Sequence, residues 1–480
     1  MSNADIGVGG LAVMGQNLVL NIERRGHSVV VYNRTAERTE RFIEQRTAGK
    51  AIEAAYTIAE FVGALSTPRK ILMMVKAGGP TDALIDQLLP LLEPGDVLID
   101  GGNAHFEDTD RRIERASALG ILYLGTGVSG GESGALNGPS IMAGGSRGAY
   151  AIAGRLLEAI AAQGPGGTCC AFFGPGSAGH YVKMVHNGIE YAIMQALTEA
   201  YDVMRRGLGM SAVESAEVFG AWNRGDLGSY LMEITQRILR RVDPETGRPL
   251  VELILDTAAQ KGTGKWSSQS ALDLGAPSPS IAAAVFARIV SALQPERVAA
   301  EAILAGPPPP IADDRDIALE DLYSAMYVTM IAAYAQGMRQ LQDASAERGY
   351  GLDLAEAARV WMDGCIIRAK LLVPIADAYR ASPDLSYLLL AEPFRTIWAD
   401  HHDGLRRAVA RCHRAGIPAP AMSSALDAID AYRTGRLPAN LLQAQRDYFG
   451  AHTYRRIDRD GSFHTEWEAE SAGGSAEAGV

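Results

Sequence analysis

The sequence lacks membrane spans, secretory features and a cysteine framework. In its 480 residues, no apolar run approaches the ~18 residues that a transmembrane helix needs. Segment 1–5 has no basic region followed by an apolar core, so we expect no secretory signal. The four cysteines fit neither a disulfide framework nor a zinc-ligand spacing. We therefore expect a cytoplasmic protein, in which the adjacent Cys169 and Cys170 are packing residues.

Positive charge is also in short supply. The chain has 45 lysines and arginines against 56 acidic residues, a formal net charge of −11. This balance argues against a general nucleic-acid or anionic-membrane partner. No cluster of histidine and carboxylate residues has the spacing of a metal site, so we expect no metal. A small-molecule substrate fits best, and an anionic one needs cations gathered locally in a cleft.

Strand-like and helix-like segments alternate along the first part of the chain. Buried, strand-like runs occur at 5–8, 28–32, 70–75, 97–100 and 121–124, and a helix is expected at 13–25. This alternation predicts a mainly parallel sheet with helices on both faces.

Beyond residue 178, apolar residues recur at helical spacing. Helices are expected at 178–207, 212–220, 229–241, 280–304, 317–346, 353–381, 387–415 and 421–432. The run 307–310 is all proline and predicts a stiff connection, while 471–475 is of disordered composition. The predicted domains are 1–177, 178–434 and a tail over 435–480.

A glycine motif follows the first predicted strand. Gly10-Leu11-Ala12-Val13-Met14-Gly15 is a G-x-A-x-x-G variant of the dinucleotide-binding fingerprint. Its glycines allow a tight turn, and the following helix N-terminus offers N–H groups to a pyrophosphate. Glycine turns are common, but the strand–turn–helix–strand context favours a nucleotide site.

The end of the second predicted strand indicates which nucleotide binds. An NAD site usually carries an acidic residue there, whereas this chain has Asn33-Arg34-Thr35, with Arg38 one turn later. Guanidinium groups and a hydroxyl suit a 2′-phosphate, so NADP is favoured over NAD. The alternative is that the arginines belong to the exposed first turn of a helix.

Three further glycine segments follow predicted strands. They are Val75-Lys76-Ala77-Gly78, Asp100-Gly101-Gly102-Asn103 and Gly127-Val128-Ser129-Gly130-Gly131. Ligands in open α/β sheets bind at the carboxyl ends of strands, so we expect three turns that line one cleft. They could instead be ordinary turns.

One helical stripe carries four polar groups. Lys183, His186, Asn187 and Glu190 are spaced i, i+3, i+4 and i+7, which places them on one face of a helix. A base, two hydrogen-bonding groups and an acid on one rod suit acid–base chemistry. The alternative is a solvated face of an amphipathic helix. Gly188 would let a neighbouring backbone or a ligand approach closely.

Together these segments resemble the 6-phosphogluconate dehydrogenase family, the decarboxylating NADP enzymes of the pentose phosphate pathway. Three later segments share the resemblance, which extends from residue 10 to residue 453: 260–266, 364–368 and 445–453. It implies an α/β Rossmann-like N-terminal domain, a large all-α domain and a C-terminal tail. It also implies a homodimer, with 6-phosphogluconate as the substrate.

The resemblance implies a role for each matched residue. Lys183 resembles the general base and Glu190 the general acid, with His186 and Asn187 beside the sugar acid. The implied substrate contacts are Asn103, Ser129, Gly130 and Gly131, with a phosphate site of Tyr191, Lys261, Thr263 and Arg288. Arg446 and His452 resemble residues that the tail of a second subunit supplies. The implied cofactor contacts are Gly10, Leu11, Ala12, Val13, Met14, Gly15, Asn33, Arg34, Thr35, Arg38, Val75, Lys76, Ala77 and Asn103.

Some residues depart from the family pattern. Gly9, Ala104, Ala143 and the pair Met362-Asp363 stand where the family usually has other residues. None of these departures removes a catalytic group, but they bear on the rigidity of turns and on cofactor affinity. Two alternatives stay open: a shorter β-hydroxyacid dehydrogenase and an inactive NADP-binding scaffold. The chain length and the phosphate set oppose the first, and the presence of Lys183 and Glu190 opposes the second.

Overall fold

The structure is a computed structural model that describes residues 3–307 and 314–468. Residue contacts divide the chain into a large unit, 1–426, and a small unit, 427–480, and each is described by itself. Residues 308–310 of the proline run and the predicted disordered segment 471–475 lie outside the described residues.

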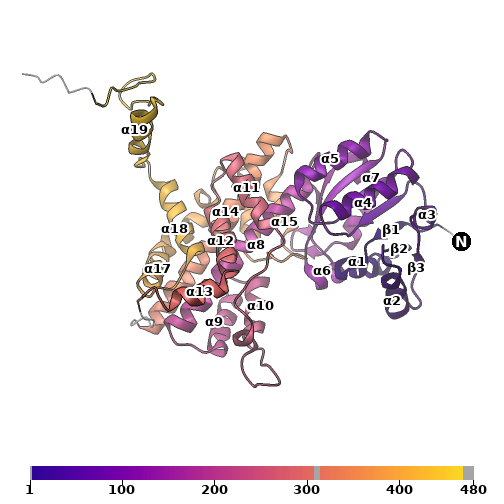
Figure 1. The fold of residues 1–480 in the computed structure, drawn as a ribbon, viewed down its shortest axis with the longest axis horizontal. Coiled ribbons are helices and arrows are strands. Elements are labelled where there is room, and N and C mark those ends of the chain that lie inside the picture. The colour runs from indigo at the N-terminus through magenta and orange to yellow at the C-terminus, as the bar shows by residue number, and fades with distance from the viewer. Residues whose placement is uncertain (1–2, 308–313, 469–480) are drawn as a thin grey trace, which may run out of the picture. The chain divides into compact units, whose positions relative to one another are not determined.

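An eight-stranded sheet forms the first part of the large unit (Figure 1). The strand order is β10-β7-β6-β5-β4-β1-β2-β3, and all neighbours are parallel except β6 and β7. The bounds are β1 (Ile6–Gly9), β2 (Val29–Tyr32), β3 (Ile52–Ala55), β4 (Lys70–Met73), β5 (Val97–Asp100), β6 (Leu122–Val128), β7 (Ile141–Gly145) and β10 (Cys170–Phe172). The predicted parallel sheet is confirmed, but β3, β7 and β10 were not predicted.

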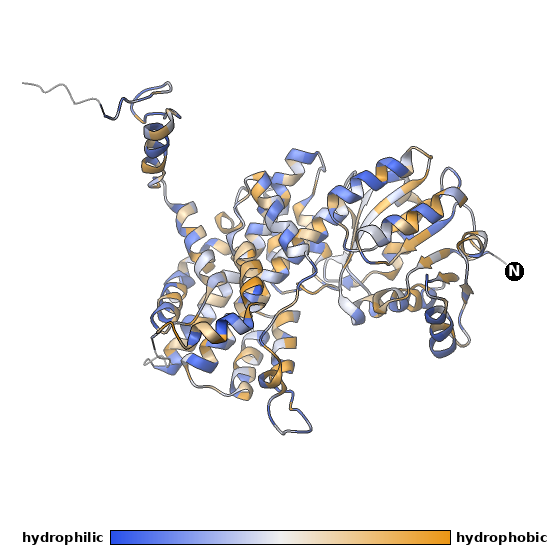
Figure 2. Cartoon of the chain, viewed as in Figure 1, coloured by the Kyte–Doolittle hydropathy of each residue, from blue (hydrophilic) through white to orange (hydrophobic). Residues whose placement is uncertain are grey.

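Helices cover both faces of this sheet, and each face has its own core. One core joins the strands to α1 (Val13–Arg24), α2 (Ala36–Arg46) and α7 (Arg147–Ile160). The other joins them to α3 (Ile58–Gly63), α4 (Gly79–Leu88) and α5 (Phe106–Ser117). The short α6 (Gly131–Asn137) packs against α1. Figure 2 shows hydrophobic strands between helices whose outer faces are hydrophilic, as burial of both sheet faces requires.

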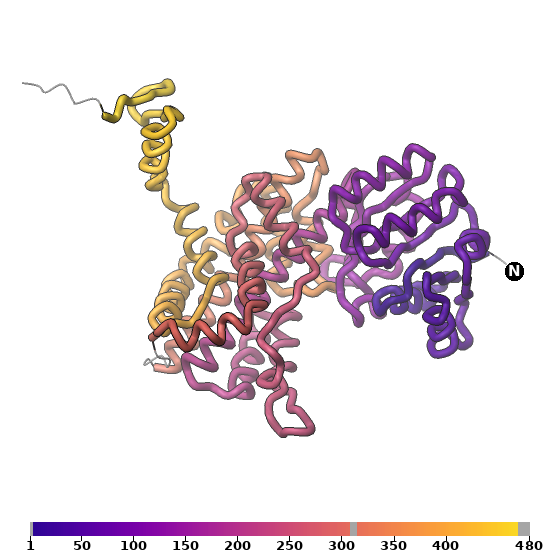
Figure 3. Tube along the Cα trace, viewed as in Figure 1, coloured from indigo at the N-terminus to yellow at the C-terminus, as the bar shows by residue number. Residues whose placement is uncertain are grey.

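Long helices build the rest of the large unit. They are α8 (Ala178–Asp202), α9 (Ala212–Arg224), α10 (Tyr230–Leu239), α11 (Thr263–Leu274), α12 (Pro279–Ser291), α13 (Gln294–Glu301), α14 (Arg315–Arg348), α15 (Leu354–Val360), α16 (Leu372–Ala381) and α17 (Phe394–Arg414). The boundary between the two units falls within α18 (Pro420–Arg433). A long loop leaves the helices between α10 and α11 (Figure 3). Within the described residues, none of the helices combines the length and apolar character needed to traverse a bilayer.

Three predicted helices are too long. The predicted helix 280–304 is two helices, because Pro295 starts a new one. The predicted helix 353–381 is interrupted at 361–371, where Gly364 has φ +65°. The predicted helix 387–415 begins only after Pro393. Conversely, α11 was missed, since its first turn contains glycine and its apolar stripe is weak.

The small unit contains α19 (Ala439–Gly450), which was not predicted, and an extended segment. Asp447 is fully buried and accepts hydrogen bonds from the Thr453 and Thr465 backbone N–H groups and from Trp467 Nε1. His464 Nδ1 lies 3.0 Å from the same carboxylate. One carboxylate therefore ties the extended segment to α19.

Candidate active site

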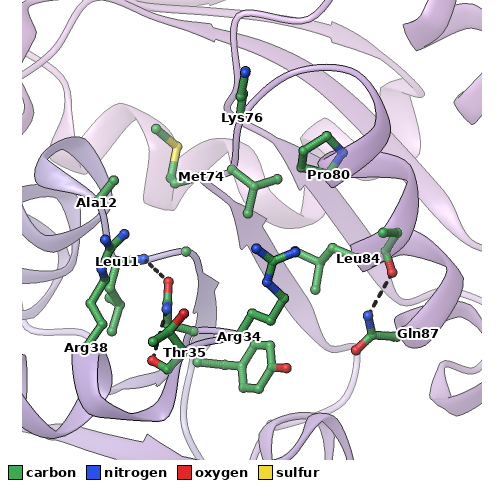
Figure 4. A pocket seen from close by; sticks show the side chains of 15 residues that line it. Leu11, Ala12, Arg34, Thr35, Arg38, Met74, Lys76, Pro80, Leu84 and Gln87 are labelled. Carbon is green, nitrogen blue, oxygen red and sulfur yellow. Dashed lines mark hydrogen bonds between the residues drawn. The ribbon is translucent and has the colours of Figure 1, made fainter.

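A cavity of about 420 Å³ lies at the carboxyl ends of β1, β2 and β4 (Figure 4). The predicted residues that line it are Gly10, Leu11, Ala12, Asn33, Arg34, Thr35, Arg38, Val75 and Lys76. Asn33 Oδ1 accepts a hydrogen bond from Leu11 N at 3.1 Å, so β2 holds the glycine turn in place. Gly10 has φ +104°, and a Cβ there would lie 2.5 Å from the Met74 carbonyl oxygen.

The remaining predicted cofactor residues do not line this cavity. Val13, Met14 and Gly15 begin α1, and Ala77 and Asn103 belong to the turns after β4 and β5. Packing requires glycine at position 15, because a Cβ there would lie 2.0 Å from the Gly10 carbonyl oxygen. Gly9 permits a tight approach to Leu84, since a Cβ at Gly9 would lie 3.3 Å from Leu84 Cδ2.

The polar rim of the cavity suits a phosphorylated ribose. Arg34, Thr35 and Arg38 are all exposed at the start of α2, and Figure 4 shows the Arg34 side chain extending across the pocket. Two guanidinium groups and a hydroxyl can bind a phosphate through charge-assisted hydrogen bonds. The donor set therefore fits NADP, with Arg34 and Arg38 as the residues that would hold its 2′-phosphate.

The stripe-bearing helix α8 packs directly on the backbone of the sheet. A Cβ at Gly127 of β6 would lie 2.3 Å from Lys183 Cβ. A Cβ at Gly179 of α8 would lie 2.4 Å from the Gly125 carbonyl oxygen and 2.5 Å from Gly144 N. Glycines on both partners therefore let the helix approach more closely than side chains would allow. The expectation that Gly127 forms a turn is wrong, since it lies inside β6.

The predicted stripe is a buried polar cluster, so the solvated-face alternative is wrong. Lys183 is 5% exposed and His186 is fully buried. Lys183 Nζ donates to Asn187 Oδ1 and lies 3.3 Å from His186 Nδ1, while Ser129 Oγ lies 3.2 Å from His186 Nε2. If Lys183 is an ammonium, Nδ1 must accept, which leaves Nε2–H to donate to Ser129.

Burial shifts the pKa of every titratable group in this cluster. It lowers the pKa of Lys183 and holds the pKa of His186 well below its usual range. It raises the pKa of Glu190, whose side chain is 21% exposed and whose Oε2 lies 3.9 Å from His186 Nδ1. The shifts are towards a neutral lysine and a protonated carboxyl, the forms that a base and an acid need.

Part of the predicted phosphate site also comes together. The Arg288 guanidinium of α12 lies 3.4 Å from the centre of the Tyr191 ring. A Cβ at Gly264 would lie 2.5 Å from the same ring, which places the start of α11, with buried Thr263, beside it. Gly188 packs against the Ser267 and Ile281 side chains, so what approaches it closely is side chains and not the expected backbone or ligand. Lys261 is exposed on the preceding loop.

Other predicted residues lie at turns or in the small unit. Asn103 is exposed after β5, and Gly130 and Gly131 have φ of +113° and +62° where α6 begins. A Cβ at Gly130 would lie 2.5 Å from the Gly364 carbonyl oxygen, and a Cβ at Gly364 would lie 2.6 Å from the Gly138 carbonyl oxygen, so packing requires glycine at both positions. Arg446 and His452 are exposed residues of the small unit.

The departures from the family pattern are structurally mild. Ala104 and Ala143 are buried packing residues. The Asp363 carboxylate accepts a hydrogen bond from Gly364 N at 2.6 Å, which supports the turn that Met362 precedes.

Two residues near the cluster were not predicted. The Trp361 ring lies 5.8 Å from the His186 ring in an edge-on arrangement. Cys365 is buried, and its thiol donates to the Trp361 carbonyl oxygen at 3.1 Å. Both lie in a segment predicted as continuous helix, although the Asp363-Gly364 pair is a turn signal that pointed to an interruption there.

A dinucleotide-type sheet joined to a buried lysine–glutamate helix defines an oxidoreductase of the two-part dehydrogenase class. Family models match almost the whole chain. Residues 5–174 match the NAD binding domain of 6-phosphogluconate dehydrogenase, and residues 179–467 match the 6-phosphogluconate dehydrogenase C-terminal domain. The chain therefore belongs to the 6-phosphogluconate dehydrogenase family.

Individual relatives agree with this assignment. The decarboxylating 6-phosphogluconate dehydrogenase of Synechococcus elongatus is 54% identical over 97% of this chain and 100% of the relative. The NADP(+)-dependent, decarboxylating enzyme of Bacillus subtilis is 53% identical over the same shares. The solved 6-phosphogluconate dehydrogenase of Plasmodium falciparum, studied with NADP+ and with 6-phosphogluconate, has a TM-score of 0.92 and 43% identity over 96% of this chain and 100% of its own.

Proposed function

We propose that this protein oxidises and decarboxylates 6-phosphogluconate to ribulose 5-phosphate and carbon dioxide, with reduction of NADP. The observation that carries the proposal is the placement of buried Lys183 and half-buried Glu190 on one helix, with pKa values shifted in opposite directions. The named activities of the full-length relatives support it. We place the reaction in the cytoplasm and in the pentose phosphate pathway.

Lys183 is the proposed general base of the oxidation. Its lowered pKa favours the neutral amine, which can take the proton of the C3 hydroxyl. Arg34 and Arg38 would hold NADP, which when bound would supply the hydride acceptor for C3. Asn187 and His186 contact the lysine amine and hold it in the cluster, while Ser129 orients His186. These contacts hold the Lys183 amine in a fixed orientation without the help of a mobile loop.

The same lysine serves the decarboxylation. After the oxidation Lys183 is an ammonium, and it can donate a hydrogen bond to the new C3 carbonyl while carbon dioxide leaves C1. The resulting enediol needs a proton at C1. Glu190 lies seven residues further along α8, about 10 Å by helical rise, and its raised pKa favours the protonated form. We assign it as the proton donor.

The substrate phosphate is assigned to cations from more than one element. Arg288, Tyr191, Thr263 and Lys261 are the proposed contacts from one subunit, with Arg446 and His452 of the partner subunit completing the set. Each charge-assisted contact contributes about 1.5–3 kcal/mol. Asn103, Gly130 and Gly131 are the proposed contacts to the sugar acid. The sequence-based domains 1–177, 178–434 and 435–480 remain our proposed boundaries.

An apolar surface supports the proposed homodimer. Leu272 of α11 is 81% exposed and Phe286 of α12 is 66% exposed, and Val290 and Val298 are exposed on α12 and α13. Large exposed apolar patches mark interfaces, and we propose that these four side chains belong to one such patch. The proposed partner is a second copy of the chain, because the phosphate site needs a tail from another subunit. Phe286→Glu should shift the protein towards monomer in analytical ultracentrifugation, and an unchanged dimer would refute this face.

The reaction is tested by incubating the purified protein with 6-phosphogluconate and NADP, without added metal. NADPH absorbance and released carbon dioxide are both followed. Equal amounts of the two products are expected, and both should vanish in Lys183→Met. Reduced cofactor without carbon dioxide would refute the decarboxylation and the role of Glu190. Tight NADP binding without turnover would favour the inactive scaffold.

A further inference from the structure

A fully buried arginine lies between the two turns that border the site. Arg112 of α5 is 1% exposed, so each of its donors needs a partner inside the protein. Its Nε donates to Asp82 Oδ1 at 2.8 Å, and its Nη2 donates to the Gly78 carbonyl oxygen at 3.1 Å. Its Nη1 lies 3.5 Å from Asp100 Oδ2. One planar guanidinium thus joins α4, the turn after β4 and the end of β5.

The contact at Gly78 fixes the turn after β4. Gly78 ends that turn and caps α4 with φ +84°, and its carbonyl oxygen also accepts from Thr81 N at 2.9 Å. Thr81 Oγ1 donates to the Lys76 carbonyl oxygen at 3.2 Å, further back in the same turn. Lys76 and Val75 line the cofactor cavity. Arg112 therefore supports the cofactor turn from behind.

The contact at Asp100 fixes the turn after β5. Asp100 is fully buried, and its Oδ1 accepts from Gly102 N at 3.1 Å, next to Asn103. Its Oδ2 accepts from the Tyr123 hydroxyl at 3.0 Å. The Asp100 carbonyl oxygen lies 3.0 Å from His180 Nε2, which is three residues before Lys183 on α8.

We infer that Arg112 is a positioning residue that holds the cofactor turn 75–78 and the substrate turn 101–103 in register with the catalytic helix. It contacts no residue that we assign to substrate or cofactor, so it acts only through the two turns. The inference deepens the proposed function and rests on it for the identity of the substrate. Lysine cannot replace it, because an ammonium lacks the fixed fork that reaches three acceptors at once.

The test compares Arg112→Lys with Arg111→Lys. Arg111 is a matched control: it is the neighbouring residue and also donates to Asp82, but it is 52% exposed and contacts neither turn. For Arg112→Lys we expect the Kd of NADP, measured by calorimetry, and the substrate KM each to rise about tenfold. Arg111→Lys should change both by less than twofold.

A purely structural role for Arg112 would lower the Tm and leave the Kd and KM of the folded protein unchanged, which would overturn the inference. If Arg112→Lys does not fold, Tyr123→Phe removes one hydrogen bond to Asp100 and keeps the ring. It should raise the substrate KM several-fold, and an unaltered KM would likewise overturn the inference. Because the Kd of NADP is measured without the sugar-acid substrate, failure of the proposed reaction would not mask this result.

Discussion

Gly127→Ala should displace Lys183, the proposed catalytic base, from its substrate. The new methyl group would lie 2.3 Å from Lys183 Cβ and 2.8 Å from Lys183 Cγ. Carbon atoms in contact are about 3.5–4.0 Å apart, so β6 and α8 must move apart by more than ~1 Å. Overpacking of this kind costs about 1–3 kcal/mol of stability. A ~1 Å misplacement of a catalytic group costs up to about 10²-fold in rate.

The assay is steady-state turnover of 6-phosphogluconate, with thermal unfolding measured on the same preparation. We expect kcat to fall at least tenfold, while the protein stays folded at room temperature. Gly63→Ala is the control, because a Cβ at Gly63, in α3, would meet nothing within 4 Å. It should leave kcat unchanged. A Gly127→Ala enzyme with kcat within twofold of the original would refute the claim that close packing aims Lys183.

Three further predictions concern charge. Burial raises the pKa of Glu199 to about 7, although it accepts the Ala421 and Met422 N–H groups. The folded state then retains a proton that the unfolded state has lost, so this contribution is complete below pH ~4.5 and disappears as pH rises through 7. Between pH 4.5 and 8, the unfolding free energy measured by urea denaturation should fall by about 3 kcal/mol more in the original protein than in Glu199→Gln. An equal pH dependence in the two proteins would contradict this prediction. Arg34→Ala should lower kcat/KM for NADP about tenfold with little change for NAD; equal losses would contradict the 2′-phosphate assignment. Asp447→Asn should speed proteolysis beyond residue 450 and raise the substrate KM, and wild-type proteolysis would show that its hydrogen bonds do not order the tail.

The chemistry of the site was readable from the sequence because it follows local spacing. The glycine turn after β1 and the four polar residues of α8 each lie within eight residues, so periodicity predicted the turn and the shared helix face, while the roles of the residues came from the family resemblance. The burial of that stripe was not readable. It depends on Gly125 and Gly127 of β6 and on Gly144 of β7, strands that lie roughly 35 to 60 residues earlier in the chain. Of these two strands, β7 was not predicted.

Elements with weak periodicity were the ones missed. The sheet edge formed by β7 and β10 is rich in glycine, alanine and cysteine, residues with little strand preference. The predicted helix 353–381 has a helical apolar pattern throughout, but Gly364 takes a left-handed conformation that lets the chain pack on Gly130. Such interruptions arise from tertiary contacts, which one sequence does not display.

The close packing of α8 on glycines of the sheet also limits how members of this family can be recombined. A chimera that joined one parent's sheet to another parent's helices at 177/178 would set a foreign helix on Gly125 and Gly144. Any side chain at position 179 would then collide with the backbone of both strands. Crossovers placed after the end of α8, in the 208–211 linker, would keep the helix with the strands it evolved against. In a shuffled gene, α8 should therefore come from the same parent as the nucleotide-binding part of the chain.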